Sequence, residues 1–329
     1  MKIRFATIGT SAITDKFITA SKLCPDLIHT GVYSRSSETA KAFAQKHNVL
    51  KTYTSLEALA KDPDIDAVYI ASPNAFHSSQ TLQMIAAGKH VICEKSIASN
   101  AQEAQIMVDA ARQKGVVLLE AMRSIKDPGF AFIKDHLPSL GDIRQATFSF
   151  CQYSSRYDRF KAGQSFNIFS FDMSAGALMD IGVYCVEPMI ALFDLPEQIS
   201  CTAVKLDNGI DGNGTIMAQY PTMNVNLLYS KITDGHAPSE IQGEAGTILI
   251  DAIACPHHVK ILYRNGQTKS FDLNDETNNM HYEARYFSEL IATGTFPEAE
   301  TAITLKSIQL MDQARKQLGI RFPADNMAN

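Results

Sequence analysis

Residues 3–14 have the sequence IRFATIGTSAIT, and this stretch decides the fold. It begins with a short apolar run typical of a buried strand, and Gly9 then permits a sharp bend. We expect a helix directly after the bend, where free N–H groups and the helix dipole favour an anion such as a pyrophosphate. The stretch therefore predicts a strand, a tight turn and a helix able to hold the phosphates of a dinucleotide.

The glycine pattern of this turn is incomplete. Dinucleotide-binding turns commonly follow the pattern G-x-G-x-x-G, but Ser11 and Thr14 occupy the second and third glycine positions. The hydroxyl of Ser11 could compensate by donating to a phosphate. Taken alone, the turn is equally compatible with an ordinary strand-to-helix connection. Contacts with the phosphates are predicted for Gly9, Thr10, Ser11, Ala12 and Ile13.

The first 120 or so residues alternate short apolar runs with segments of helical spacing. The apolar runs are residues 3–8, 27–33, 67–71, 90–93 and 116–119. A repeated β-α-β pattern with nearly continuous apolar strands indicates a parallel sheet covered on both faces. We therefore predict an α/β Rossmann domain, a doubly wound parallel sheet, over residues 1–122, with ligands at the carboxyl ends of its strands.

The pattern changes near residue 140 to strands in series joined by tight turns. Predicted strands are 143–150, 199–206, 215–220, 225–229, 247–250 and 259–263. Asn-Gly and Asp-Gly pairs at 208–209, 211–212 and 265–266 signal turns, and helices are predicted over 176–192, 281–293 and 302–317. Residues 123–329 are therefore predicted to form an α+β C-terminal domain with a large, mainly antiparallel open sheet.

Composition restricts the class of function. Of the 329 residues, 45% are apolar and 20% are charged, as in an ordinary globular enzyme. The net charge of −5 provides no basic field for nucleic acid or an anionic membrane. No uninterrupted apolar run approaches the roughly 20 residues that span a bilayer. We expect a small-molecule enzyme that binds neither nucleic acid nor membrane.

The six cysteines are scattered without a C-x-x-C pair, which is typical of a reducing cytoplasm. One local cluster suggests a metal, at Cys255-Pro256-His257-His258. Neighbouring residues on a strand point to opposite faces, so His257 and His258 are not expected to converge on one ion. No metal site is predicted.

The end of the second predicted strand bears on the choice of cofactor. NAD enzymes commonly have an acidic residue about 20 positions beyond the glycines, to hold the ribose 2′-OH. Here Ser34, 25 positions after Gly9 (34 − 9), is followed by Arg35. A guanidinium beside hydroxyls suits a 2′-phosphate, so NADP is predicted in preference to NAD. The alternative is a solvated arginine at the start of a helix.

Two further predicted strands end in polar residues at the carboxyl edge of the sheet. Ser72, Asn74 and His77 follow one strand, and Glu94 and Lys95 follow the next. A lysine after a buried strand is costly unless it has a polar role or reaches water. Beside a nicotinamide, the ammonium of Lys95 could hold a substrate hydroxyl and stabilise oxyanion character. The alternative is an ion pair between Glu94 and another cation.

In the second half, Asp180 and Tyr184 are spaced i,i+4, so on a helix they share one face. Gly182 lies between them and would let a cofactor ring or another backbone approach closely. A phenol accepts a proton usefully only where a cation favours the phenolate, and Lys95 could supply that cation. Each residue also has a structural alternative. Tyr184 could be a packed core tyrosine, and Asp180 could be a solvated or capping carboxylate.

Together these segments resemble the Gfo/Idh/MocA oxidoreductase family over essentially the whole chain. The matching pieces are Gly9, Ser34-Arg35, Ser72-Pro73-Asn74 with His77, Glu94-Lys95 and residues 176–184. Residues 180–185 are especially similar to the branch of dimeric dihydrodiol dehydrogenases and NADP-dependent D-xylose dehydrogenases. Inositol dehydrogenases place a histidine at the position of Tyr184.

The resemblance implies hydride exchange between nicotinamide C4 and a carbon bearing a secondary hydroxyl on a sugar, polyol or dihydrodiol. Lys95 would polarise that hydroxyl, Tyr184 would be the general acid/base, and Asp180 would orient the substrate or tune the pair. The residues implied to line the nicotinamide and its ribose are Asn74, His77 and Glu94, and those lining the substrate are Tyr153, Arg156, Tyr157 and Asn167.

The resemblance also implies a homodimer through the C-terminal sheet and a helix 302–317 that packs back on the Rossmann domain. Two features depart from the family pattern: Ser96 replaces the usual proline after Lys95, and residues 120–128 differ from the expected aromatic- and arginine-containing pattern. A non-catalytic sensor of dinucleotides or sugars on the same fold is the alternative function. An enzyme acting on an amino-acid-like or tetrapyrrole substrate is a further one.

Overall fold

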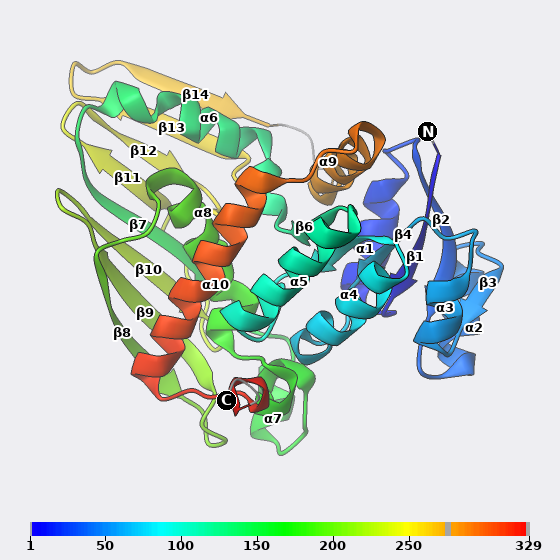
Figure 1. Cartoon of the computed structure of the whole chain (residues 1–329). Helices are drawn as coiled ribbons and strands as arrows, with labels where there is room; N and C mark the ends of the chain where they lie inside the picture. Colours follow the sequence, from blue (N-terminus) through cyan, green and yellow to red (C-terminus); the bar gives the residue numbers. More distant parts are fainter. Residues whose placement is uncertain (1, 274–277, 327–329) are drawn as a thin grey trace. The chain divides into compact units, whose positions relative to one another are not determined.

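The computed structural model of the protein describes residues 2–273 and 278–326, which belong to two compact units (Figure 1). The first unit contains residues 1–121 and 277–305, and the second contains residues 122–276 and 306–329. The helix predicted over residues 302–317 lies within α10 (Glu298–Leu318), which runs from one unit into the other.

The first unit is built on a parallel sheet whose strand order is β3-β2-β1-β4-β5-β6. The strands are β1 (Ile3–Ile8), β2 (Leu27–Tyr33), β3 (Lys51–Tyr53), β4 (Ala67–Ile70), β5 (His90–Glu94) and β6 (Leu118–Ala121). This order confirms the predicted doubly wound Rossmann sheet, and it reverses between β1 and β4. Strand β3 was not predicted, because its three residues are only half-buried and carry no apolar run.

Of the following helices of the first unit, all but the last connect these strands. They are α1 (Ala12–Ser21), α2 (Ser37–Lys46), α3 (Leu56–Lys61), α4 (His77–Ala86), α5 (Ala101–Lys114) and α9 (Met280–Thr293), with a 3₁₀ turn at Asn74–Phe76. The ring of Phe17 on α1 stacks on Tyr69 of β4, with centroids 3.8 Å apart. All four residues of β4 are buried, as expected of a strand covered on both faces.

The second unit is built on a sheet with strand order β14-β13-β12-β11-β7-β10-β9-β8. Its strands are β7 (Ile143–Cys151), β8 (Gln198–Lys205), β9 (Asp211–Gln219), β10 (Asn224–Ser230), β11 (Ser239–Gly243), β12 (Gly246–Ile250), β13 (His258–Tyr263) and β14 (Thr268–Asp272). Only the β7–β10 pair is parallel among the described strand pairs of this sheet, which confirms the predicted, mainly antiparallel sheet.

The helices of the second unit are short apart from α8 and α10. They are α6 (Pro128–His136), α7 (Tyr157–Lys161) and α8 (Val183–Phe193), with 3₁₀ turns at Arg123–Lys126, Leu137–Leu140, Asn167–Phe169, Phe171–Met173 and Pro323–Asn326. A π-helical turn at Leu178–Gly182 leads directly into α8, so the helix predicted over 176–192 is not uniform. Asp211 begins β9, which corrects its assignment to a turn.

Within the described residues, one helical stretch is long and apolar enough, by length and composition, to cross a membrane: Phe171–Phe193, of 23 residues. It contains no uninterrupted apolar run of that length, in agreement with the sequence analysis, because Asp172, Asp180 and Glu187 interrupt it. Of the most apolar part of the stretch, 78% is buried inside the fold. That burial is typical of a core helix.

Candidate active site

The turn after β1 lies against the turn after β4, at the point where the strand order reverses. Gly9 has a φ of +117°, and a Cβ at this position would lie 2.7 Å from the carbonyl oxygen of Ala71. Only glycine fits there, because both the backbone conformation and the available space exclude a side chain. In open α/β sheets this reversal point is where dinucleotides bind.

The start of α1 is compatible with a bound pyrophosphate. Ser11 is the N-cap residue, but its side chain makes no hydrogen bond to the backbone of the helix. Its exposed hydroxyl lies 3.4 Å from the Thr14 hydroxyl. The first N–H groups of a helix have no partner within the helix, so Thr10, Ala12 and Ile13 lie where an anion would be bound. The residues present therefore fit a dinucleotide.

Ser34 and Arg35 follow β2, as the sequence predicted. The Ser34 N–H donates to the carbonyl oxygen of Tyr53 at 3.1 Å, which fixes the backbone at this point. Arg35 is exposed, and its guanidinium forms no ion pair within the described part of the chain. An exposed guanidinium at the end of β2 suits a 2′-phosphate better than a bare ribose hydroxyl.

His77 joins the loop after β4 to the loop after β5. Its Nε2 lies 2.8 Å from the carbonyl oxygen of Ser72, and its Nδ1 lies 2.9 Å from that of Ser96. The side chain is fully buried, and burial lowers the pKa of His77. His77 thus links the two loops, and its contact with the nicotinamide stays a prediction. Asn74 begins the intervening 3₁₀ turn, and the Ser72 hydroxyl donates to Gln80 Oε1 at 2.7 Å.

Glu94 and Lys95 differ in their surroundings although they are adjacent. Glu94 is buried, and its Oε1 accepts from the hydroxyl of Tyr69 at 2.5 Å. Lys95 is half-buried, and the peptide bond between Lys95 and Ser96 is cis. The fixed carboxylate and the more accessible ammonium thus lie at the carboxyl end of β5, where the sequence placed them.

Glu120 holds the loop that carries Lys95, a role that the sequence did not predict. Its Oε1 accepts from the backbone N–H of Ile97 at 2.9 Å, and its Oε2 accepts from the Thr304 hydroxyl at 2.7 Å. The signal for such a role was a carboxylate at the end of an apolar strand, where burial requires a hydrogen-bonding partner.

In the second unit, Asp180 forms an ion pair with Lys231. Lys231 directly follows β10, its side chain is almost fully buried, and its Nζ lies 5.0 Å from the centroid of the Phe169 ring. The sequence analysis did not identify this lysine, although the argument used for Lys95, an ammonium after a buried strand, applies equally to it.

Asp211 fixes the π-helical turn that carries Asp180. Its Oδ2 accepts from the backbone N–H of Leu178 at 2.6 Å. A Cβ on Gly176 would lie 2.1 Å from Asp211 Oδ1, so a glycine is required where the carboxylate reaches the turn. Burial raises the pKa of Asp211 to about 6.

Tyr184 is buried and contacts both an aromatic ring and a cation. The ring of Phe150 meets it edge-on at 5.5 Å, and the guanidinium carbon of Arg123 lies 5.5 Å from its centroid. Gly182 does not make room for a cofactor: a Cβ there would lie 3.0 Å from Cγ of Tyr229, so the glycine accommodates that ring.

The four predicted substrate residues lie on one segment of the second unit. The Tyr153 hydroxyl donates to Asp158 Oδ1 at 2.6 Å, and the guanidinium carbon of Arg156 lies 6.0 Å from the Phe166 ring centroid. Tyr157 begins α7, and Asn167 is exposed at the start of a 3₁₀ turn. The Tyr157 ring lies 6.0 Å from Phe169, the residue that also contacts Lys231.

Comparison with known proteins decides the family. Residues 3–122 match the model of the Gfo/Idh/MocA oxidoreductase family, NAD-binding Rossmann fold, and residues 138–249 match a Gfo/Idh/MocA C-terminal domain. The scyllo-inositol 2-dehydrogenase (NADP(+)) IolU of Bacillus subtilis is 45% identical over 325 residues, which cover 98% of this chain and 99% of that protein. The chain belongs to the Gfo/Idh/MocA oxidoreductase family.

Other members of the family agree with this result. The mouse trans-1,2-dihydrobenzene-1,2-diol dehydrogenase is 30% identical over 346 residues, covering 99% of both chains. A 3-ketoreductase from Actinomadura kijaniata, solved with NADP and TDP-benzene, superimposes with a TM-score of 0.87 at 22% identity, covering 96% of this chain and 98% of that one. The latter likeness supports the fold.

The predictions of family, fold, enzyme class and cofactor class are thereby confirmed: this Gfo/Idh/MocA protein is an NAD(P)-dependent oxidoreductase acting on CH–OH groups. Identity is higher with an inositol dehydrogenase than with the mouse dihydrodiol dehydrogenase.

Proposed function

We propose that the protein is an NADP-dependent dehydrogenase of a cyclic polyol, of which scyllo-inositol is the first candidate, or the corresponding ketone reductase. This proposal rests on the 45% identity with the scyllo-inositol 2-dehydrogenase (NADP(+)) IolU, which extends over nearly the full length of both chains. A binding titration of NADPH and NADH, followed by turnover assays with inositols, aldoses and trans-diols, tests it. Binding of NADPH without turnover of any compound would favour a sensor.

A bound nicotinamide supplies the hydride acceptor. We propose that Lys95 binds and polarises the reacting hydroxyl, and that Tyr184 exchanges its proton. Asp180, whose carboxylate is part-exposed, supplies an acceptor for a neighbouring hydroxyl of a polyol, and the buried Lys231 holds that carboxylate in place. The segment carrying Tyr153, Arg156, Tyr157 and Asn167 adds further hydroxyl, guanidinium and amide groups for the same substrate.

The preference for NADP rests on the end of β2. A 2′-phosphate carries negative charge and binds best to a guanidinium, whereas NAD offers a hydroxyl that an acidic residue would hold. Here Arg35 is exposed and Ser34 precedes it, with no carboxylate at either position. Glu94 and Asn74 are proposed to line the nicotinamide and its ribose, at the ends of β5 and β4.

A homodimer through the outer face of the eight-stranded sheet and a cytoplasmic location complete the proposal. Residues alternate between buried and accessible along β9, and Met217 on its outer face is 46% exposed. All six cysteines are free thiols, as expected in a reducing compartment. Light scattering should give twice the chain mass, and Met217→Lys should weaken the dimer. A monomeric wild-type protein would contradict this part.

A further inference from the structure

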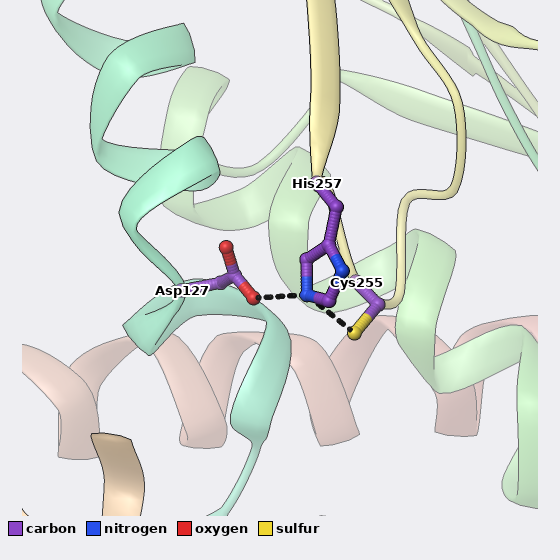
Figure 2. A group of neighbouring side chains, drawn as sticks. All are labelled: Asp127, Cys255 and His257. Atoms are coloured by element: carbon purple, nitrogen blue, oxygen red, sulfur yellow. Dashed lines mark hydrogen bonds and ion pairs between the residues drawn. The ribbon is translucent and has the colours of Figure 1, made fainter. Parts of the chain in front are cut away.

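Three metal-binding side chains meet at one end of the second unit. Asp127 lies immediately before α6, and Cys255 and His257 lie in the loop between β12 and β13 (Figure 2). His257 Nε2 lies 3.5 Å from Asp127 Oδ2 and 3.3 Å from Cys255 Sγ. All three atoms lie within 4.8 Å of one another.

The local backbone holds these side chains in place. Asp127 is the N-cap residue of α6, and its Oδ1 accepts from the Gly129 N–H at 3.0 Å, which leaves Oδ2 directed at His257. A Cβ on Gly129 would lie 1.7 Å from the carbonyl oxygen of Pro256, so this glycine lets the loop lie against the start of the helix. The N–H of Leu273 donates to the His257 carbonyl oxygen at 2.8 Å and fixes the loop from its other side.

The geometry differs from that of a nucleophilic relay. In such a relay, the thiol and the carboxylate contact opposite nitrogens of the imidazole. Here both contact the same nitrogen, Nε2, so the arrangement is a cluster around that atom and not a relay through the ring (Figure 2). Zinc bonds of about 2.0 to 2.3 Å in a tetrahedral site place neighbouring ligand atoms about 3.3 to 3.6 Å apart. The two separations at Nε2 fall in this range.

We propose that Asp127, Cys255 and His257 bind a zinc ion. One sulfur, one imidazole and one carboxylate match the ligand preferences of Zn²⁺, and the charges of a thiolate and a carboxylate balance the ion. The Asp127 side chain is fully buried, whereas Cys255 and His257 are partly exposed, so the ion has a route of entry and water can complete the tetrahedron. Binding releases the thiol proton of Cys255 to solvent.

The proposed site ties two segments that are distant in sequence. Asp127 and His257 are 130 positions apart (257 − 127), so no local sequence motif predicts the site. His258 turns away, with its Nδ1 3.0 Å from Asp272 Oδ1, in agreement with the expectation that the adjacent histidines diverge. His258 is thus no ligand, and the ligand that completes the set with Cys255 and His257 is Asp127, the N-cap residue of α6. Zinc would clamp the start of this helix to the loop between β12 and β13, and its role is structural.

Metal content tests the proposal on the full-length protein. After stripping with EDTA, incubation with Zn²⁺ and gel filtration, the wild type should retain one zinc per chain by mass spectrometry. Cys255→Ala and His257→Ala should each lose it. His258→Ala and Cys201→Ala are matched controls, since they change a neighbouring histidine and another part-exposed thiol, and both should retain it. With Co²⁺, a thiolate-to-metal absorption band should appear and should be absent in Cys255→Ala.

Thermal unfolding gives a second readout that does not depend on activity. Zinc at a hundredfold excess over its dissociation constant should raise the midpoint of the wild type and of His258→Ala by about 5 °C or more. It should leave His257→Ala unchanged. Failure of the wild type to retain zinc, or equal retention by Cys255→Ala and His257→Ala, would overturn the proposal in favour of a simple hydrogen-bonded cluster. Cys255→Ser, which conserves shape, serves if the alanine variant does not fold.

Discussion

Lys231 and Asp180 form an ion pair whose two partners differ sharply in exposure: the lysine side chain is 3% exposed and the aspartate 35%. The ammonium is held inside the second unit, against the Phe169 ring, while its carboxylate partner also faces solvent. A buried charge is tolerated only with a partner, so Asp180 satisfies Lys231 as well as presenting an oxygen to the outside.

This asymmetry predicts unequal effects of two conservative changes. Asp180→Asn removes the carboxylate that pairs with the buried ammonium and should lower the free energy of unfolding by about 3 kcal/mol. Lys231→Met leaves only a part-exposed carboxylate, which water can solvate, and should cost about 1 kcal/mol. Urea unfolding of both variants measures the difference. A larger loss for Lys231→Met would show that the lysine does not depend on Asp180.

A surface pair provides the control. Lys306 contacts Asp194 at 2.6 Å, with 38% and 64% of their side chains exposed. Lys306→Met should change the free energy of unfolding by less than about 1 kcal/mol, because exposed ion pairs contribute little. It should also leave turnover unchanged, whereas Lys231→Met should lower kcat/KM by about 10-fold or more if the pair contacts substrate.

Asp211 predicts a specific dependence of stability on pH. Burial raises its pKa from 3.8 to about 6, so the folded state holds this proton more tightly than the unfolded state does. The resulting stabilisation is fully present below pH 4 and is lost as the pH rises through 6. Asp211→Asn keeps an oxygen for the Leu178 N–H but does not titrate. Relative to the variant, the wild type should therefore lose about 1 kcal/mol between pH 5 and pH 7.5.

Urea unfolding of both proteins at the two pH values measures this difference. Asp251→Asn, which removes an exposed aspartate, is the control and should show no such change. A constant gap between wild type and Asp211→Asn across the range would mean that the carboxyl titrates normally despite its burial.

The sequence predicted the folds of both units because hydrophobic periodicity reports burial directly. Nearly continuous apolar runs identified the parallel strands, whereas β3, with three half-buried residues, gave no such signal. The positions of Gly9 and Lys95 directly after strands were also predicted correctly, since the strand pattern alone places them there. Residues whose partners lie far away in the sequence were not predicted.

Asp211 illustrates this second group. An Asp-Gly pair normally signals a turn, but its carboxylate reaches a backbone N–H 33 positions earlier, at Leu178 (211 − 178). The same holds for Glu120 and Thr304, whose contact joins β6 to α10. Such pairs depend on tertiary packing, which spacing along one chain does not reveal.

Replacing Tyr184 tests its role as the general acid/base. Tyr184→Phe keeps the ring that packs against Phe150 and Arg123, so stability and NADPH affinity should change little. Turnover should fall by about 100-fold or more, because the proton then lacks a positioned acceptor. Tyr220→Phe removes a different hydroxyl, one that donates to the Asp194 carbonyl oxygen at 2.7 Å, and should lower stability by about 1 kcal/mol with normal turnover. Retained turnover in Tyr184→Phe would rule out its proposed role.

Arg35 decides between the two dinucleotides. Charge-assisted hydrogen bonds to a phosphate contribute about 1.5 to 3 kcal/mol, so Arg35→Ala should weaken NADPH binding by about 10- to 100-fold. NADH lacks the 2′-phosphate, and its dissociation constant should change by less than about twofold. Arg264→Ala, at an exposed position of the second unit, should affect neither cofactor. Fluorescence titration of both dinucleotides measures the ratio. An equal loss for NADPH and NADH would place Arg35 on a part that the two share, and the preference for NADP would then need another source.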